Sequence, residues 1–263
     1  MSGEGIRYAV FTKPWKMPLP ELGKFVKDMG FDGIELPVRP EYQVEPESVA
    51  KGLPEAAKIL ADCGVKIESI AGPTDEATIE ACGKAGVPII RICESISKEE
   101  NYLDAEDSLQ MKYDNLVPIL DRYGVTLGIQ NHCNRFVPNA MCLKSLIGGY
   151  NSKHVAAVWD AAHNALNGED LDLAIDIIYP QICMVNLKNG YWKRQTGPEA
   201  EVAKWKVYWT SGRQGLASWP LVAQELKKRD WFGVLCLTAE YSDHDSVDRL
   251  IKEDLALAKS LFE

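Results

Sequence analysis

Short apolar runs alternate with longer amphipathic segments along the whole chain. The runs are apolar at successive positions and rich in β-branched residues, which is typical of parallel strands that are buried on both faces. We count eight predicted strands, at residues 6–12, 31–36, 65–71, 87–93, 125–130, 155–160, 182–187 and 232–238.

The segments between these runs have helical periodicity, with apolar residues three or four positions apart. Four of them end at a glycine (Gly30, Gly64, Gly86 or Gly124) that suits the left-handed position after a helix. The periodicity predicts helices over 19–29, 46–63, 75–85, 107–123, 139–148, 170–178, 218–228 and 245–262.

Strands separated by helices require parallel crossover connections. Eight such units in 263 residues match the size of a (β/α)8 TIM barrel, which we predict as a single domain over residues 1–263. The alternative is an open doubly wound sheet, which favours a glycine-rich first turn. Residues 12–18, the first turn here, contain no glycine, so the barrel is preferred.

One connection departs from this regular alternation. Residues 188–217 have weak periodicity and contain Trp192, Trp205 and Trp209. We predict a long Trp-rich loop after the seventh strand, at the face of the barrel where active sites lie. Its aromatic residues either close a site or pack against the barrel or a second subunit.

The composition excludes several classes of protein. The net charge is −9 and no cluster of Lys and Arg supplies a basic face, which argues against a nucleic-acid partner. The seven cysteines are scattered without a Cys-x-x-Cys pair, which indicates neither a disulfide framework nor a zinc ribbon. No apolar stretch approaches the roughly 20 residues of a membrane span, and the N-terminus lacks a secretory signal pattern. We therefore predict a cytoplasmic protein with no membrane partner.

Polar and aromatic residues gather where the predicted strands end, which is the catalytic face of a barrel. Flat rings combined with carboxylates, amides and basic groups are typical of carbohydrate sites, although each residue taken singly also suits a structural role. The candidates are Trp15, Glu35, Arg91, Glu94, Gln130, Asn131, His132, Asp160, His163, Asn186, Lys188 and Glu240, with Trp192 and Arg213 from the Trp-rich loop.

Five motifs in this order resemble those of the xylose isomerase-like TIM barrels, the sugar and sugar-phosphate isomerase/epimerase group. They cover nearly the whole chain. The motifs are Phe-Asp-Gly-Ile-Glu-Leu at 31–36, Gly-Ile-Gln-Asn-His at 128–132, Val-Trp-Asp-Ala-Ala-His at 158–163, Val-Asn-Leu-Lys at 185–188, and Gly-Val-Leu-Cys-Leu-Thr-Ala-Glu at 233–240.

The resemblance implies a divalent ion, Mn²⁺, Mg²⁺, Co²⁺ or Zn²⁺, held by side chains from the last four strands. By position the ligands are Gln130, Asp160, Asn186 and Thr238, and three of these four depart from the family pattern. Glu240 points the same way as Thr238 if the strand continues, because strand side chains alternate with period two. A displaced metal ligated by Asp160, Gln130 and Glu240 is therefore one hypothesis, and a metal-free site is the other. The sequence contains no glycine-rich phosphate-binding loop, so we predict no nucleotide cofactor.

Two functions follow from this interpretation. The first is a carbohydrate or polyol isomerase, epimerase or related dehydratase that moves a proton next to a carbonyl. Its catalytic candidates are His132 and His163 as proton carriers, Glu240 as a base, and Lys188, which polarises a carbonyl or anchors an anionic group with Arg91. The second is a metal-free barrel that binds a sugar or a protein partner without turnover. A homo-oligomer is compatible with both.

Overall fold

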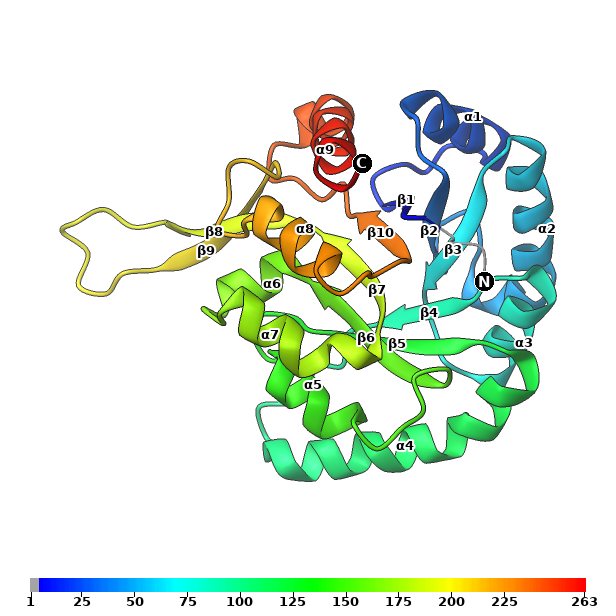
Figure 1. Ribbon diagram of the computed structural model, residues 1–263, viewed down its shortest axis with the longest axis horizontal. Helices are drawn as coiled ribbons and strands as arrows, with labels where there is room; N and C mark the ends of the chain where they lie inside the picture. The colour runs from blue at the N-terminus through cyan, green and yellow to red at the C-terminus, as the bar shows by residue number, and fades with distance from the viewer. Residues whose placement is uncertain (1–4) are drawn as a thin grey trace.

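The computed structural model describes residues 5–263. Within them eight parallel strands close into a barrel in the order β1-β10-β7-β6-β5-β4-β3-β2 (Figure 1). This confirms the predicted TIM barrel and all eight predicted strands. The barrel strands are β1 (Arg7–Phe11), β2 (Gly33–Pro37), β3 (Lys66–Ala71), β4 (Ile89–Ile92), β5 (Thr126–Gln130), β6 (Val155–Asp160), β7 (Ile182–Leu187) and β10 (Val234–Leu237).

Helices surround the barrel and follow the predicted amphipathic segments closely. One short helix, α6, lies outside the predicted set, because six residues are too few to show a periodicity. The α-helices are α1 (Leu19–Met29), α2 (Val49–Asp62), α3 (Glu76–Ala85), α4 (Tyr102–Tyr123), α5 (Ala140–Ile147), α6 (Ala161–Leu166), α7 (Leu171–Ile178), α8 (Trp219–Lys227) and α9 (Val247–Phe262), and the 3-10 turns are η1 (Pro46–Ser48), η2 (Tyr179–Gln181) and η3 (His244–Ser246).

The buried apolar residues form two layers, as expected when strands present alternate residues to opposite faces. A large outer layer joins the strands to the helices and includes Leu36, Leu53 and Trp219. A small inner layer fills the barrel with Ala9, Phe11, Ala71, Ile89, Val158, Met184, Val234 and Cys236. The inner residues mark which positions of each strand point into the barrel.

Several glycines lie where a side chain would be unfavourable, either because φ is positive or because there is no space for a Cβ. Gly30, Gly64, Gly86 and Gly124 all have positive φ, as the sequence predicted for residues that follow a helix. Gly128 has a different role inside the barrel, because a Cβ there would lie 2.6 Å from Cγ2 of Val158. The barrel interior therefore has room only for glycine at this position of β5.

The predicted Trp-rich loop after the seventh strand is wrong in one respect, because it contains an antiparallel hairpin. Strands β8 (Asn189–Arg194) and β9 (Trp205–Thr210) pair along six positions and project beyond the helices (Figure 1). The weak periodicity of the segment reflects a ribbon that is buried at its base and exposed towards its tip, since burial falls along β8 from Asn189 to Arg194. Its base is fixed by Asn189, whose buried amide donates to the carbonyl groups of Gly212 and Ala217 at 2.8 Å.

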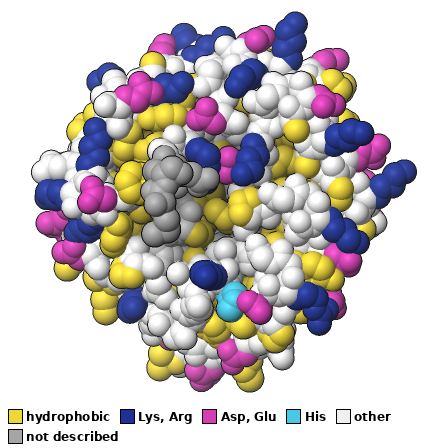
Figure 2. Space-filling model, turned by 45° about the vertical axis from the view of Figure 1, so that its right-hand side comes forward, with side chains coloured by type: hydrophobic (Ala, Val, Ile, Leu, Met, Phe, Trp, Pro, Cys, Tyr) yellow, Lys and Arg dark blue, Asp and Glu magenta, His cyan; other side chains and the backbone are white. Residues whose placement is uncertain are grey.

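The surface shows no concentration of one charge on the face drawn in Figure 2, where Lys and Arg side chains are interspersed with Asp and Glu. Among residues 5–263, no helix combines the length and the apolar character needed to cross a membrane.

Candidate functional site

A layer of polar side chains lies directly above the apolar interior of the barrel. Ile89, Val158 and Met184 point inward, and the strand period of two places the next inward position two residues later. Those positions hold Arg91, Asp160 and Asn186, which are all buried. The carboxyl ends of the strands thus bring polar groups together over an apolar floor.

A cavity of about 150 Å³ opens above this layer. It contains all four catalytic candidates (His132, His163, Lys188 and Glu240), the proposed metal positions, and Arg91 and Asn186. It also contains residues that the sequence did not single out, of which Lys13 and Arg39 are cationic. The full lining is Phe11, Lys13, Arg39, Arg91, Cys93, Gln130, His132, Asp160, His163, Asn186, Lys188, Thr238 and Glu240.

The end of β10 differs from the geometry that the sequence suggested for Thr238 and Glu240. The strand stops at Leu237, and Ala239 has a φ of 52°, a left-handed conformation that costs a non-glycine residue about 1–2 kcal/mol. Thr238 and Glu240 therefore do not project in parallel from one strand. The turn nevertheless brings both side chains to the cavity.

Glu240 lies between two lysines. Lys13 Nζ donates to its Oε1 at 2.5 Å and Lys188 Nζ donates to its Oε2 at 2.8 Å. Burial alone would raise the pKa of Glu240, but the two ammonium groups outweigh it and lower that pKa to about 2. Glu240 is therefore a carboxylate at neutral pH and holds Lys188 in place.

Amide groups occupy the positions at which the resemblance implied a metal. Asn186 Nδ2 donates to Gln130 Oε1 at 3.2 Å, and Gln130 Nε2 donates to Asp160 Oδ2 at 3.0 Å. The other oxygen of Asp160 accepts the backbone N–H of His163 at 3.0 Å. The fourth of these positions is Thr238, which is uncharged. Asp160 is therefore the only charged group of the four, and both of its oxygens already have partners. This donor set fits a divalent ion poorly, because hard dications require several oxygen ligands with negative charge.

Asp160 also shapes the site through the backbone. It is the N-cap of α6, and this cap fixes His163 three residues later at the start of the helix. Burial raises the pKa of Asp160 to about 6, although Lys188 and the hydrogen bond from His163 act in the opposite direction. The Asp-x-x-His motif is thus a helix cap whose fourth residue faces the cavity.

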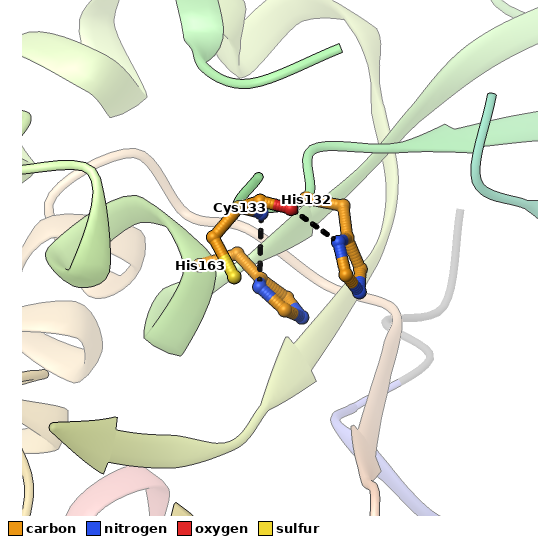
Figure 3. Close-up of side chains that lie close together, drawn as sticks. All are labelled: His132, Cys133 and His163. Atoms are coloured by element: carbon orange, nitrogen blue, oxygen red, sulfur yellow. Dashed lines mark hydrogen bonds between the residues drawn. The ribbon is translucent and has the colours of Figure 1, made fainter. Parts of the chain in front are cut away.

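The rings of His132 and His163 lie next to each other, with their centroids 3.8 Å apart and their planes tilted by 31° (Figure 3). The backbone N–H of Cys133 donates to Nδ1 of His163 at 3.1 Å, so the proton of the neutral ring lies on Nε2. Nδ1 of His132 lies 2.8 Å from the carbonyl oxygen of Cys133, which only accepts. His132 therefore donates through Nδ1 and keeps a lone pair on Nε2. Burial lowers the pKa of both rings, so both are neutral at pH 7.

His132, Cys133 and His163 place ligand atoms within 4.8 Å of one another (Figure 3). Metal binding requires lone pairs that are free. The lone pair of His163 already accepts a backbone hydrogen bond, and burial raises the pKa of the Cys133 thiol to about 11. Only Nε2 of His132 remains as a free ligand atom, so this group also fits a metal ion poorly.

Two buried polar atoms in the cavity have no partner among the described residues: Nε2 of His163 and Oδ1 of Asn186. The first is a donor, and the second is an acceptor. Unpaired buried groups of this kind cost stability and are typical of positions where a ligand completes the hydrogen bonding. Together they match a hydroxyl or carbonyl group of a bound molecule.

Six sequence candidates lie outside the lining of the cavity. Glu35 is fully buried and forms a bidentate pair with Arg91, at 3.0 and 2.6 Å. The other five are used in packing or in structural hydrogen bonds: Trp15 donates to Asp248, Glu94 accepts from Lys112 and Tyr113, Asn131 bonds the backbone of Asp160, Trp192 donates to the carbonyl of Leu166, and Arg213 lines a separate depression beside α8.

Trp209 is the site residue that the sequence analysis placed only within the loop. The Nζ atom of Lys188 lies 3.7 Å from its ring centroid, and the ring of His163 meets it edge-on at 5.2 Å. Hydrogen bonds between its backbone and Ser242 hold it there. The hairpin thereby covers two of the catalytic candidates. No local pattern distinguishes Trp209 from Trp192 and Trp205, because all three lie in paired strands of the hairpin.

Comparison with known proteins supports the same fold. The sequence model of the xylose isomerase-like TIM barrel family matches residues 24–261. Solved structures that resemble the chain include an L-ribulose 3-epimerase (TM-score 0.75, 16% identity, 98% of this chain and 94% of that one) and a 3-keto-D-glucoside 4-epimerase from E. coli (TM-score 0.72, 13% identity, 97% and 99%). A third is a probable 3-DHS dehydratase from Bacillus anthracis (TM-score 0.72, 14% identity, 96% and 98%).

A search of curated protein sequences found no match. The family match nevertheless extends over most of the chain, from α1 to α9, and agrees with the closed barrel. The chain belongs to the xylose isomerase-like TIM barrel family.

Proposed function

We propose that the protein is a carbohydrate or polyol isomerase, epimerase or dehydratase that moves a proton next to a carbonyl group with its own side chains. The observation that carries this proposal is the unpaired Nε2–H of His163, which lines the same cavity as the Lys188 ammonium. Both groups pack on the ring of Trp209. A carbonyl oxygen bound there would meet two donors in a site shielded from water.

The chemistry follows from these protonation states. His132 is neutral with a lone pair on Nε2, so it can take the proton from the carbon beside the carbonyl. The electron pair of that C–H bond moves to the carbonyl oxygen, where Lys188 and His163 stabilise the enediolate. Return of the proton to the neighbouring carbon gives the isomer, and its return to the same carbon from the opposite face gives the epimer. Departure of the hydroxyl group from the next carbon, as water formed with the abstracted proton, gives the dehydrated product. Asp160 lines the same cavity and has a pKa of about 6, so in this proposal it is the second proton carrier that epimerisation requires.

Structural neighbours support the substrate class, because several carry names of sugar epimerases and one is a probable dehydratase. The cavity agrees with a polyhydroxylated ligand, since its lining combines amides, carboxylates and cations with the ring of Phe11. In this proposal Arg91 and Asn186 hold hydroxyl groups and Glu240 orients Lys188.

Proton abstraction can be tested without knowledge of the product. The protein is incubated in D₂O with a panel of aldoses, ketoses and inososes, and deuterium incorporation beside the carbonyl is followed by NMR. We expect incorporation with at least one member and a loss of 10²–10⁴-fold in rate for His132→Asn. His154→Asn is the matched control, because His154 pairs with Asp121 outside the cavity lining. Absence of deuterium incorporation across the panel would refute the catalytic proposal.

The second candidate function is binding of a carbohydrate without turnover. The observation that favours it is the hydrogen-bonded chain Asn186–Gln130–Asp160, which stands where the family resemblance implied a metal. A sugar that raises the melting temperature but never exchanges its protons in D₂O would support this function instead. A ligand at 100 times its Kd adds about 2.7 kcal/mol of stability, which a thermal shift detects.

A further inference from the structure

A second depression adjoins the catalytic cavity and has a different character. Its volume is about 360 Å³, against about 150 Å³ for the cavity. The two share Lys13 and Glu240 in their linings, so they lie side by side with this ion pair at their boundary. The depression lies between the turn after β1, the hairpin and the start of α9.

Aromatic and aliphatic side chains dominate this depression. Tyr42, Trp209 and Tyr241 supply three rings, and Pro14 and Val247 supply aliphatic surface. The polar atoms of the two tyrosines point elsewhere, since Tyr42 donates to the carbonyl of Lys13 at 3.2 Å and Tyr241 donates to Asp254 at 2.8 Å. The hydroxyl groups of both tyrosines therefore already have partners, so the depression offers a ligand mainly apolar contact. Lys16 Nζ lies 4.8 Å from the centroid of the Tyr42 ring and leaves at most one face of that ring for a ligand.

We infer that this depression is a subsite for a ring with an apolar face, joined to the sugar that occupies the catalytic cavity. The inference rests on the proposed function and names its substrate class as a glycoside rather than a free monosaccharide. Trp209 connects the two regions, because it packs on Lys188 and His163 and also lines the depression. Flat rings gain affinity on such walls through area burial and ring stacking.

The chemistry of the substrate follows from this linkage. A sugar joined through its anomeric carbon cannot open to an aldehyde, so the reacting carbonyl is a ketone on the ring. The proton that moves is on the ring carbon beside that ketone. A reaction that oxidises one hydroxyl group of a glycoside must therefore supply the substrate.

Two kinds of ring present an apolar face: an aryl group and a second sugar. Calorimetric titration distinguishes them by comparing methyl, phenyl and glucosyl β-glycosides of glucose, galactose and xylose as probes. We expect the phenyl or the glucosyl compound of at least one sugar to bind ten times more tightly than its methyl counterpart. A gain with the phenyl compounds identifies an aryl group, and a gain with the glucosyl compounds alone identifies a second sugar.

A variant that fills the depression supplies the structural control. Val247→Trp places a large side chain where the ring would lie, and it is expected to abolish the gain without weakening the methyl glycoside. Val202→Trp is the matched control, because Val202 is 69% exposed in the turn between β8 and β9 and is absent from the lining of the depression. This control should retain the gain.

The outcomes separate this inference from the proposed function. If methyl glycosides bind and neither larger compound binds more tightly, the subsite is refuted and the carbohydrate site stands. If Val247→Trp leaves the gain intact, the larger ring lies elsewhere and the subsite is again refuted. If no probe of any class binds and no sugar exchanges a proton in D₂O, the proposed function fails together with the subsite.

Discussion

Removal of the Glu240 carboxylate should destabilise the protein in a pH-dependent way. Glu240 accepts hydrogen bonds from both Lys13 and Lys188, and the Lys188 side chain is only 8% exposed. Glu240→Gln leaves that buried ammonium without its carboxylate partner. Loss of one member of a buried ion pair is costly, because the remaining charge keeps its desolvation penalty.

The magnitude follows from the pKa of the carboxyl group. A fall from 4.5 to about 2 corresponds to roughly 3 kcal/mol, since one pKa unit is worth about 1.4 kcal/mol. Between these two values the unfolded chain binds a proton that the folded protein does not, so stability rises with pH. The contribution is therefore complete above about pH 4.5 and is lost as the pH falls towards 2.

Urea denaturation measures this directly. At pH 7 we expect Glu240→Gln to lower the free energy of unfolding by about 3 kcal/mol, and the difference from wild type to shrink steadily below pH 4.5. The matched control is Glu253→Gln, because Glu253 pairs with Arg249 on the surface, where both side chains are more than half exposed. Such a pair contributes at most about 1 kcal/mol. A loss below 1 kcal/mol for Glu240→Gln, or a loss that is equal at pH 3 and pH 7, would refute the reasoning.

Three further predictions concern the polar layer of the barrel. Burial raises the pKa of Asp160 from 3.8 to about 6, so wild-type stability should fall relative to Asp160→Asn by up to about 3 kcal/mol as the pH rises from 4 to 6; parallel urea profiles would contradict this. Arg91→Met should lower the free energy of unfolding by about 3–5 kcal/mol, because it leaves Glu35 buried and unpaired. In a double-mutant cycle, the addition of Glu35→Met should recover most of this loss, whereas additive effects of the two substitutions would argue against the pair. Gln130→Glu combined with Thr238→Glu should create a Mn²⁺ site that titration calorimetry detects and that the wild type lacks; equal Mn²⁺ affinity of the two proteins would show that the amide network does not exclude the ion.

The sequence was sufficient for the fold because hydrophobic periodicity is a local property of the chain. Each barrel strand is apolar at successive positions, and each crossover carries an amphipathic helix, so the eight units could be counted directly. The same reasoning found the strand ends, and with them His132, His163, Lys188 and Glu240, which all line the cavity.

Only the tertiary structure decided how these residues are paired. Glu35 lies within β2, and Glu94 and Glu240 follow β4 and β10. Yet Glu35 pairs with Arg91 and Glu94 with Lys112, while Glu240 faces the cavity. Sequence position gives the end of the barrel at which a side chain lies, but its hydrogen-bond partner depends on residues that are distant along the chain. For this reason the sequence could not predict which candidate residues line the cavity and which form structural pairs elsewhere.

The same distinction applies to protonation and to the hairpin. The proton on Nε2 of His163 is fixed by the backbone N–H of Cys133, thirty positions earlier in the chain, and no local pattern encodes it. Trp209 became part of the site because pairing with β8 and hydrogen bonds to Ser242 carry its ring over Lys188. Periodicity determines which faces are buried, whereas the chemistry of a site depends on long-range contacts that exist only after the barrel has closed.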